Sequence, residues 1–275
     1  MKKSFLLSAT LTIGFVSMLA LGPQNARAEA CLLDTNEDGD ADSGIDTVGG
    51  AVSDEGDFEV ACGVGAVASG ANSTAVGAST LANATSTTAF GFAAMATQAN
   101  ATAIGADAIA MGSESTALGQ GSQALGTGSI ALGVDTQAMQ DGSIAIGLNA
   151  QSTGLNAAAF GINTVAGNNN TSVVGFEASA TGLSASAFGR QANAGGDNST
   201  ALGRTAAAAG GSATAIGNAA SAGSNVSTAV GAAAVTTGTG GTAIGRLANA
   251  SATFSTAVGN ETTAAFNRST AVGDG

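Results

Sequence analysis

The acidic residues near the start of the chain have the types and spacing of a calcium-binding loop. Oxygen-bearing side chains fall on alternate positions, and Gly39 supplies the turn; the candidate ligands are Asp34, Asn36, Asp38, Asp40 and Asp42. Hard carboxylate and amide oxygens in this order suit Ca²⁺. The twelfth position holds Ile45, where a bidentate Glu is expected. The alternative is a solvated acidic cap that blunts the open end of a β-structure.

The only two cysteines, Cys31 and Cys62, flank this acidic segment. In an exported chain the default interpretation is a disulfide. It would close a loop of about thirty residues and contribute roughly 3 to 4 kcal/mol to stability. A free buried thiol is the first alternative. An intermolecular disulfide is the second, and it is disfavoured because Cys62 is expected to point inward.

Arg190, Arg204 and Arg246 each follow a glycine of the repeated pattern described below, so we expect them to line up on one turn ridge. Such a ridge either binds a ligand or carries ordinary solvated surface charge. The Asn-Ser-Thr triplets within the repeats are interpreted as turn residues rather than as glycosylation sites.

Residues 1–28 have the features of a secretory signal peptide. A basic start is followed by an apolar run to Leu21 and by an A-x-A cleavage site at 26–28. Ser, Thr and Gly interrupt the run, which disfavours a membrane-spanning helix. The sequence thus predicts a signal peptide over 1–28, an acidic N-terminal cap over 29–60 and repeats over 61–275, in an oxidising compartment.

The charge and composition of the exported part exclude several classes of function. Four arginines and no lysine stand against nineteen acidic residues, a net charge of −15. Such a chain does not attract nucleic acid. The exported part also lacks His, Tyr and Trp, so most general bases and nucleophiles are missing. The sequence therefore predicts a protein that is not an enzyme and has no cofactor, calcium excepted.

A glycine recurs every fourteen residues through the rest of the chain. These marker glycines are Gly63, Gly77, Gly91, Gly105, Gly119, Gly133, Gly147, Gly161, Gly175, Gly189, Gly203, Gly217, Gly231, Gly245, Gly259 and Gly273. An unbroken period of this kind predicts a solenoid. Low-complexity disorder is the alternative, because small and polar residues dominate, but the unbroken register argues against it.

Each repeat divides into two short strands and two tight turns. A large apolar residue precedes the marker glycine, Ala precedes that residue and Thr usually precedes the Ala, as in Ser73–Gly77 (STAVG). Strand alternation places the apolar residue and the Thr on one face, which we expect to be the core, and the Ala on the other. In the second strand, small residues three and five places after the marker flank an outward position such as Asn249. Fifteen steps of about 4.8 Å make a rod roughly 70 Å long.

With the faces assigned in this way, the outward Ala face of the first strand predicts that the protein is an oligomer. This Ala face is as uniform as the expected core, whereas a solvated face would vary and turn polar. A uniformly small face indicates that another backbone approaches closely there.

The repeats resemble the heads of trimeric autotransporter adhesins, the YadA-like family of Gram-negative surface proteins. The family's pattern N-S-x-A-φ-G, followed by x-x-S/A-x-A-x-G, matches Asn72–Gly77 and the coils after it, over residues 61–275. The resemblance implies an all-β, left-handed parallel β-roll solenoid of fourteen-residue coils that forms a homotrimer. It also implies adhesion to host extracellular matrix, to a cell-surface ligand or to an abiotic surface.

The chain departs from this family at its C-terminus. Members continue into a neck, a coiled-coil stalk and a membrane anchor, but here no heptads or aromatic-ended amphipathic strands follow Gly273. We expect no transmembrane anchor within this chain. It is then a fragment or truncated product of a longer precursor, or a head without its own anchor, either held on the outer membrane or secreted.

Two other functions are consistent with a solenoid. A stacked Thr column is typical of ice-binding solenoids, but Ile130, Ile144 and Ala158 interrupt the column and we expect it to point inward. A purely structural surface-layer protein is the other alternative.

Overall fold

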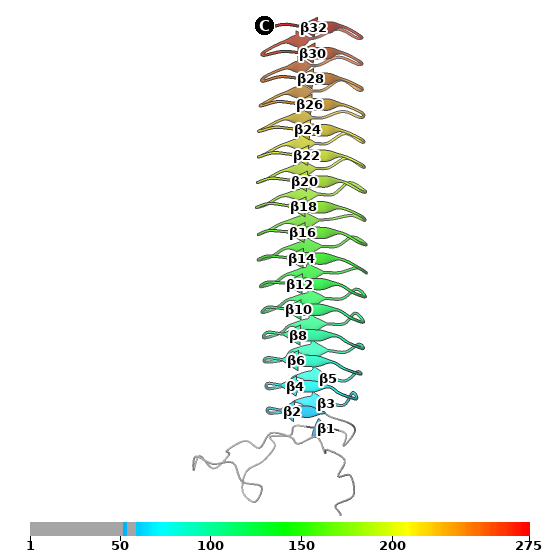
Figure 1. The fold of residues 1–275 in the computed structure, drawn as a ribbon, viewed down its shortest axis with the longest axis vertical. Helices are drawn as coiled ribbons and strands as arrows, with labels where there is room; N and C mark the ends of the chain where they lie inside the picture. Colours follow the sequence, from blue (N-terminus) through cyan, green and yellow to red (C-terminus); the bar gives the residue numbers. More distant parts are fainter. Residues whose placement is uncertain (1–51, 54–58) are drawn as a thin grey trace, which may run out of the picture.

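The computed structural model describes residues 52–53 and 59–275, which form a straight two-layered β-solenoid (Figure 1). Two parallel sheets of sixteen strands run the length of the rod. The expected all-β solenoid is confirmed. The predicted signal peptide and most of the acidic cap lie outside the described residues, so the boundaries at 28 and 60 stay predictions.

Consecutive strands alternate between the two sheets. The even sheet contains β2 (Val60–Cys62), β4 (Thr74–Val76), β6 (Thr88–Phe90), β8 (Thr102–Ile104), β10 (Thr116–Leu118), β12 (Ile130–Leu132), β14 (Ile144–Ile146), β16 (Ala158–Phe160), β18 (Ser172–Val174), β20 (Ser186–Phe188), β22 (Thr200–Leu202), β24 (Thr214–Ile216), β26 (Thr228–Val230), β28 (Thr242–Ile244), β30 (Thr256–Val258) and β32 (Thr270–Val272). The odd sheet contains β1 (Val52–Ser53), β3 (Val67–Ala68), β5 (Leu81–Ala82), β7 (Met95–Ala96), β9 (Ile109–Ala110), β11 (Gln123–Ala124), β13 (Gln137–Ala138), β15 (Gln151–Ser152), β17 (Val165–Ala166), β19 (Ser179–Ala180), β21 (Asn193–Ala194), β23 (Ala207–Ala208), β25 (Ser221–Ala222), β27 (Val235–Thr236), β29 (Asn249–Ala250) and β31 (Thr263–Ala264).

The fourteen-residue register predicted from the marker glycines is confirmed along the rod. In the even sheet Ala117 pairs with Ala131 of the next coil, and in the odd sheet Gln123 pairs with Gln137. Each strand pairs only with the strands one coil before and one coil after it in the same sheet. Only the first pair departs from this register, with Val52 opposite Val67.

Alanine, and not the large apolar residue, fills the core. Ala215 is fully buried at the centre of β24, while its neighbours Thr214 and Ile216 are partly exposed. The same pattern holds along the even sheet, with Val173 replacing the central alanine in β18. The expectation that the large apolar residues and the threonines face inward is therefore wrong, and so is the oligomer argument drawn from an outward Ala face.

The reason is the narrowness of the coil. Strands of three and two residues are joined by tight turns, so the interior of each coil has room mainly for small side chains. The hydroxyl of Ser152, on the odd sheet, donates to the carbonyl of Ala157 at the entrance to the even strand, 2.8 Å away. The interior therefore holds mainly Ala, Ser and Thr, and most larger side chains point outward; Val173 is the fully buried exception in the even sheet.

In the second strand of each repeat, the predicted inward and outward positions are correct. Ala248 and Ala250 are fully buried, and Asn249 between them is partly exposed. The same small residues flank an outward position in the other odd strands. The sequence pattern thus identified the inner face of the odd sheet and misassigned that of the even sheet.

The marker glycines are required by conformation and by stacking. Gly77 has a φ of +127°, a region that side chains rarely adopt. A Cβ there would lie 2.6 Å from the carbonyl oxygen of Gly91 in the next coil. Buried hydroxyls close the turn that follows: Thr80 Oγ1 donates to the Gly77 carbonyl at 2.9 Å. The period is exact because each marker backbone packs directly on the next.

Among the described residues no helix is long and apolar enough to cross a membrane.

Replacing Ala215 by Asp should destabilise the solenoid strongly. The substitution puts a carboxylate between Ala201 and Ala229 with no cationic partner, and burying an unpaired charge costs several kcal/mol. Circular dichroism melts of the exported chain should show a large loss of stability. Asn249→Asp, at an outward position, is the matched control and should stay within about 0.5 kcal/mol of the parent. Equal damage from both changes would contradict the faces described.

Candidate functional site

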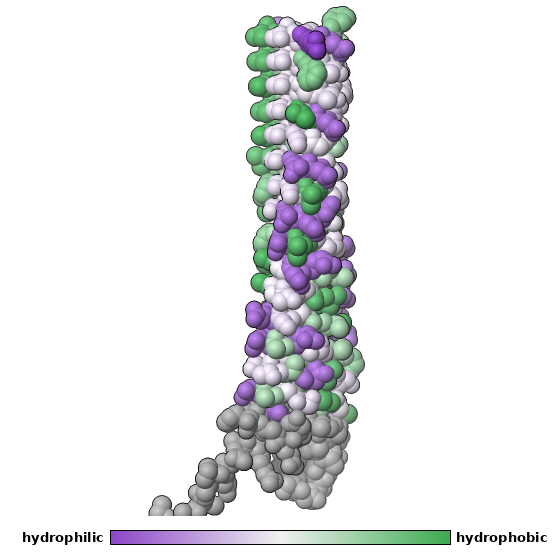
Figure 2. Space-filling view, turned by 90° about the vertical axis from the view of Figure 1, so that its right-hand side faces the viewer, coloured by the Kyte–Doolittle hydropathy of each residue, from purple (hydrophilic) through white to green (hydrophobic). Residues whose placement is uncertain are grey.

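An unbroken apolar column covers the outer face of the even sheet. It consists of the residues that precede the marker glycines: Cys62, Val76, Phe90, Ile104, Leu118, Leu132, Ile146, Phe160, Val174, Phe188, Leu202, Ile216, Val230, Ile244, Val258 and Val272. All are at least partly exposed, and Phe90 and Leu202 are 54% and 46% exposed. Figure 2 shows apolar side chains stacked along the left edge of the upper rod. A continuous apolar surface of this length marks an interaction face.

The threonine column lies beside the apolar column on the same outer face. Thr200, Thr214 and Thr228 pair in register in β22, β24 and β26, and all three are partly exposed. The inward orientation expected for these threonines is therefore wrong. Because that orientation was one reason to disfavour ice binding, the reason no longer holds, although Ile130, Ile144 and Ala158 still interrupt the column.

The outer face of the odd sheet changes character along the rod. The outward residues of β3, β5, β7 and β9 are Val67, Leu81, Met95 and Ile109. Those of β11, β13 and β15 are glutamines, which form an in-register ladder. Later strands carry a mixture in the same position: valine in β17 and β27, and small or polar residues in the others. This variation contrasts with the uniform apolar column on the other sheet.

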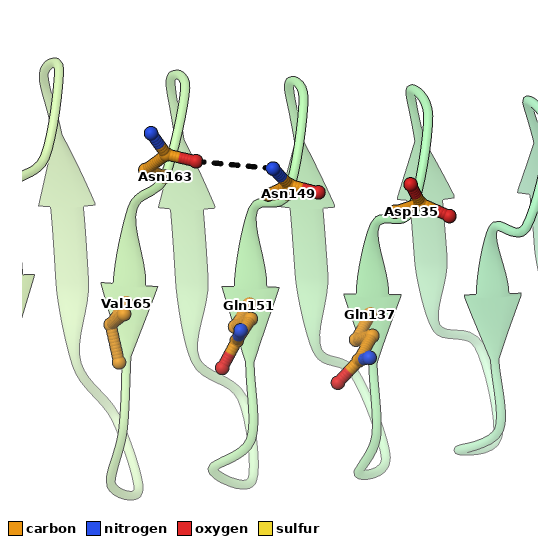
Figure 3. Close-up of a pocket in the computed structure, with 6 residues that line it drawn as sticks. All are labelled: Asp135, Gln137, Asn149, Gln151, Asn163 and Val165. Carbon is orange, nitrogen blue, oxygen red and sulfur yellow. Dashed lines mark hydrogen bonds between the residues drawn. The ribbon is translucent and has the colours of Figure 1, made fainter.

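A polar groove opens where the glutamine ladder meets the turns that follow the marker glycines. It has a volume of about 640 Å³ and is lined by Asp135, Gln137, Asn149, Gln151, Asn163 and Val165. In Figure 3 the glutamine amides project away from β13 and β15, and the Asp and Asn side chains line the adjoining turns. Asn149 Nδ2 donates to Asn163 Oδ1 at 3.3 Å.

The three predicted ridge arginines lie in the same turn position of their coils, and all are exposed. The guanidinium of Arg190 lies 5.8 Å from the centre of the Phe176 ring one coil earlier. Arg204 Nε donates to Asn218 Oδ1 at 3.2 Å, and Arg246 pairs with Glu261. Each guanidinium thus has a neighbour in an adjacent coil. Nothing in these contacts selects a ligand, so the ridge remains a proposal.

Cys62 occupies the first position of the apolar column rather than the core. The residue is partly exposed, so its expected inward orientation is wrong. No cysteine among the described residues has a free thiol. Its predicted partner Cys31 and the calcium candidates Asp34, Asn36, Asp38, Asp40 and Asp42 lie outside those residues, so the pairing and the calcium loop stay predictions.

Sequence reasoning missed the polar groove. The alternation of the second strand places Gln137 at the same outward position as Asn249, but it does not connect Gln137 with its neighbours in the turns. A usable signal was present, because five of the eight glutamines fall between Gln120 and Gln151. The second signal was that Asp135, Asn149 and Asn163 follow one another at intervals of fourteen residues.

Comparison with known proteins gives a family match. Eight stretches match the YadA head domain repeat (2 copies), namely residues 60–80, 82–108, 110–136, 124–150, 180–206, 227–248, 237–262 and 250–275. Together they cover more than half of the chain. No curated protein matches the chain.

The matched stretches begin with the first even strand and reach the end of the solenoid. They contain most of the marker glycines, of the alanine core and of the apolar column, and residues 151–179 and 207–226 lie between them. Heads of this family are homotrimeric adhesins of Gram-negative cell surfaces and are not enzymes. The fold and the family match agree, and the chain belongs to the YadA head-repeat family.

Proposed function

We propose that this chain is the head of a homotrimeric surface adhesin in which the apolar columns of three chains meet. The single observation that carries the proposal is the unbroken column of sixteen partly or fully exposed residues on one sheet. Each of these side chains lies on a flat strand, so the column presents a self-complementary surface to a second and third copy. The left-handed sense of the coil, implied by the resemblance, belongs to this proposal.

The energetics of the column favour assembly over its whole length. Covering a half-exposed Val, Leu, Ile or Phe contributes about 1 kcal/mol at about 25 cal/mol per Å². The fifteen such residues of the column contribute on the order of 15 kcal/mol per chain, which matches or exceeds the roughly 4 to 15 kcal/mol that association costs. One or two coils would not suffice. A long uninterrupted column is therefore what an obligate assembly of such thin coils needs.

The ligands of the head are host extracellular matrix, cell-surface molecules or abiotic surfaces. A rod with three copies of a repetitive outer face gains avidity from many weak contacts. The ridge with Arg190 and Arg204 would add cationic positions on an otherwise acidic molecule. The head acts at the bacterial surface or, if no anchor is attached, as a secreted protein.

Ice binding is the second candidate, and the outward threonine column is the observation that favours it. The two functions compete for the same face, because a trimer that covers the apolar column also covers the adjacent threonines. Oligomeric state therefore separates them. A monomer with thermal hysteresis would support ice binding, whereas a trimer without it supports the adhesin.

Ile216→Asp should separate the trimer while leaving each coil folded. The carboxylate would be outward in one chain, but three copies would be brought together at the interface without cationic partners. Light scattering should show a trimer for the parent and a monomer for the variant, with β-sheet circular dichroism retained in both. Asn249→Asp, on the opposite sheet, is the control and should remain trimeric. A parent monomer, or a variant trimer of unchanged stability, would refute the proposed interface.

Attachment should depend on the trimer. Beads coated with the full exported chain should bind surfaces coated with matrix proteins or cells, and beads with Ile216→Asp should detach much more readily because avidity is lost. Asn249→Asp beads should behave as the parent. If parent beads attach to no tested surface, the adhesive function is wrong and the structural surface-layer interpretation is favoured.

We also propose that Cys31 and Cys62 form a disulfide within one chain. Thiol labelling of the unfolded, unreduced protein should find no free cysteine, and a denaturing gel without reductant should show a single-chain band. The gel matters because Cys62 lies in the apolar column, where copies from different chains would approach each other. Two labelled thiols, or a disulfide-linked dimer, would contradict the intrachain bond.

A further inference from the structure

We infer that the polar groove on the odd sheet binds a neutral polysaccharide that lies along the rod. The groove is the one formed by Asp135, Gln137, Asn149, Gln151, Asn163 and Val165. This inference names a ligand class for the adhesive head and rests on that proposed function.

The groove is placed where a ligand can reach it in the assembly. Gln137 and Gln151 project from the outer face of the odd sheet, while the apolar column covers the outer face of the even sheet. The two sheets form opposite layers of the coil, so a trimer built on the apolar column leaves the groove facing solvent. The trimer would then carry three copies of the groove, one on each chain.

The groove presents hydrogen-bonding groups that the protein itself does not use. The side-chain amides of Gln137 and Gln151 make no hydrogen bond within the described residues, and neither does the carboxylate of Asp135. Because Asn149 donates to Asn163, the Asn149 oxygen and the Asn163 amino group remain available. A side-chain amide offers a donor beside an acceptor, which matches two neighbouring hydroxyl groups of a sugar.

The backbone that carries these groups is ordered before any ligand arrives. Asp135, Asn149 and Asn163 have φ values of +53°, +53° and +54°, the left-handed conformation of the turn. Their backbone amides donate to carbonyls one coil earlier at 2.9 to 3.0 Å. The glutamines stand on paired strands. Little conformational freedom is lost from the backbone on binding, which favours affinity for a weakly interacting ligand.

The spacing of the groove suits a linear polymer of sugars. The same two positions repeat in successive coils, and neighbouring coils are about 4.8 Å apart. A sugar unit in an extended polysaccharide is about as long as this step. A chain along the rod axis therefore meets a pair of amide or carboxyl groups at two successive levels, and at the third level it meets Asn163 beside the apolar Val165.

Charge decides which polysaccharides fit. The groove contains the Asp135 carboxylate and no arginine, and the exported chain carries a strong negative charge. Sulfated or uronic polymers would be repelled, so the ligand is uncharged. The corresponding residues farther along the rod do not reproduce the groove: the Gln191 amide is already engaged, donating to Glu177 Oε2 at 2.8 Å.

Native gel electrophoresis through immobilised polysaccharides tests the inference on the full exported chain. The probes are hydroxyethyl cellulose, arabinoxylan, galactomannan and dextran, with heparin as the anionic comparison. At least one neutral polymer should retard the parent, and Gln137→Ala with Gln151→Ala should weaken that retardation at least tenfold. The matched control, Asn193→Ala with Asn249→Ala, removes two amides from the same outward column outside the groove and should bind as the parent.

Three results would overturn the inference: no retardation by any neutral polymer, equal loss in the groove and control variants, or groove-dependent retardation by heparin alone. Bead attachment to matrix proteins or cells is read separately. Attachment without polysaccharide binding supports the proposed adhesive function and refutes the proposed ligand of the groove. Polysaccharide binding without attachment supports the groove ligand and refutes adhesion to those surfaces.

Discussion

The space between the two sheets has room mainly for side chains no larger than threonine at each inward position, and the rest of the molecule depends on this limit. Alanine, serine and threonine therefore occupy the interior, and the residues that could form an ordinary hydrophobic core are displaced to the outside. A single chain consequently keeps a stable backbone ladder but exposes most of its large apolar side chains. The hydrophobic driving force that other domains use internally is left for contacts between chains.

The fold could be predicted from the sequence more completely than the faces of its strands. The marker glycines from Gly63 to Gly273 specify coil length, parallel register and the number of steps without any structural information. Alternation in a strand, however, separates two faces without saying which is inside. Hydrophobicity favours Ile216 over Ala215 as the inward residue. The small interior of the closed coil instead places Ala215 inside and Ile216 outside. In the odd sheet the small residues lie on both sides of Asn249. Residue size and strand alternation therefore both place these small residues inside, and the predicted inward face was correct.

In the proposed trimer, one outer face of the solenoid serves assembly and the other serves recognition. The column stays apolar from Val76 to Val258, which fits the proposal that it meets copies of itself at every level. The outward residues of the odd strands change from Ile109 to Gln123 and from Gln151 to Val165. Side chains that vary from coil to coil create local chemistry such as the polar groove. Sequence reasoning did not find that groove because its parts are brought together by stacking and are separated by fourteen residues in the chain.

Pairing of every strand with only its two nearest counterparts in the same sheet has a consequence for how such a gene can change. Loss or duplication of the codons for one complete coil removes or adds a level, and the backbone ladder closes again above and below it. Recombination between near-identical coding repeats therefore alters reach in fixed increments and leaves the cross-section unchanged. Loss of part of a coil would move one marker glycine out of register with the carbonyl on which it packs and would break the ladder at that level. Length is the property that this architecture allows a lineage to vary most freely.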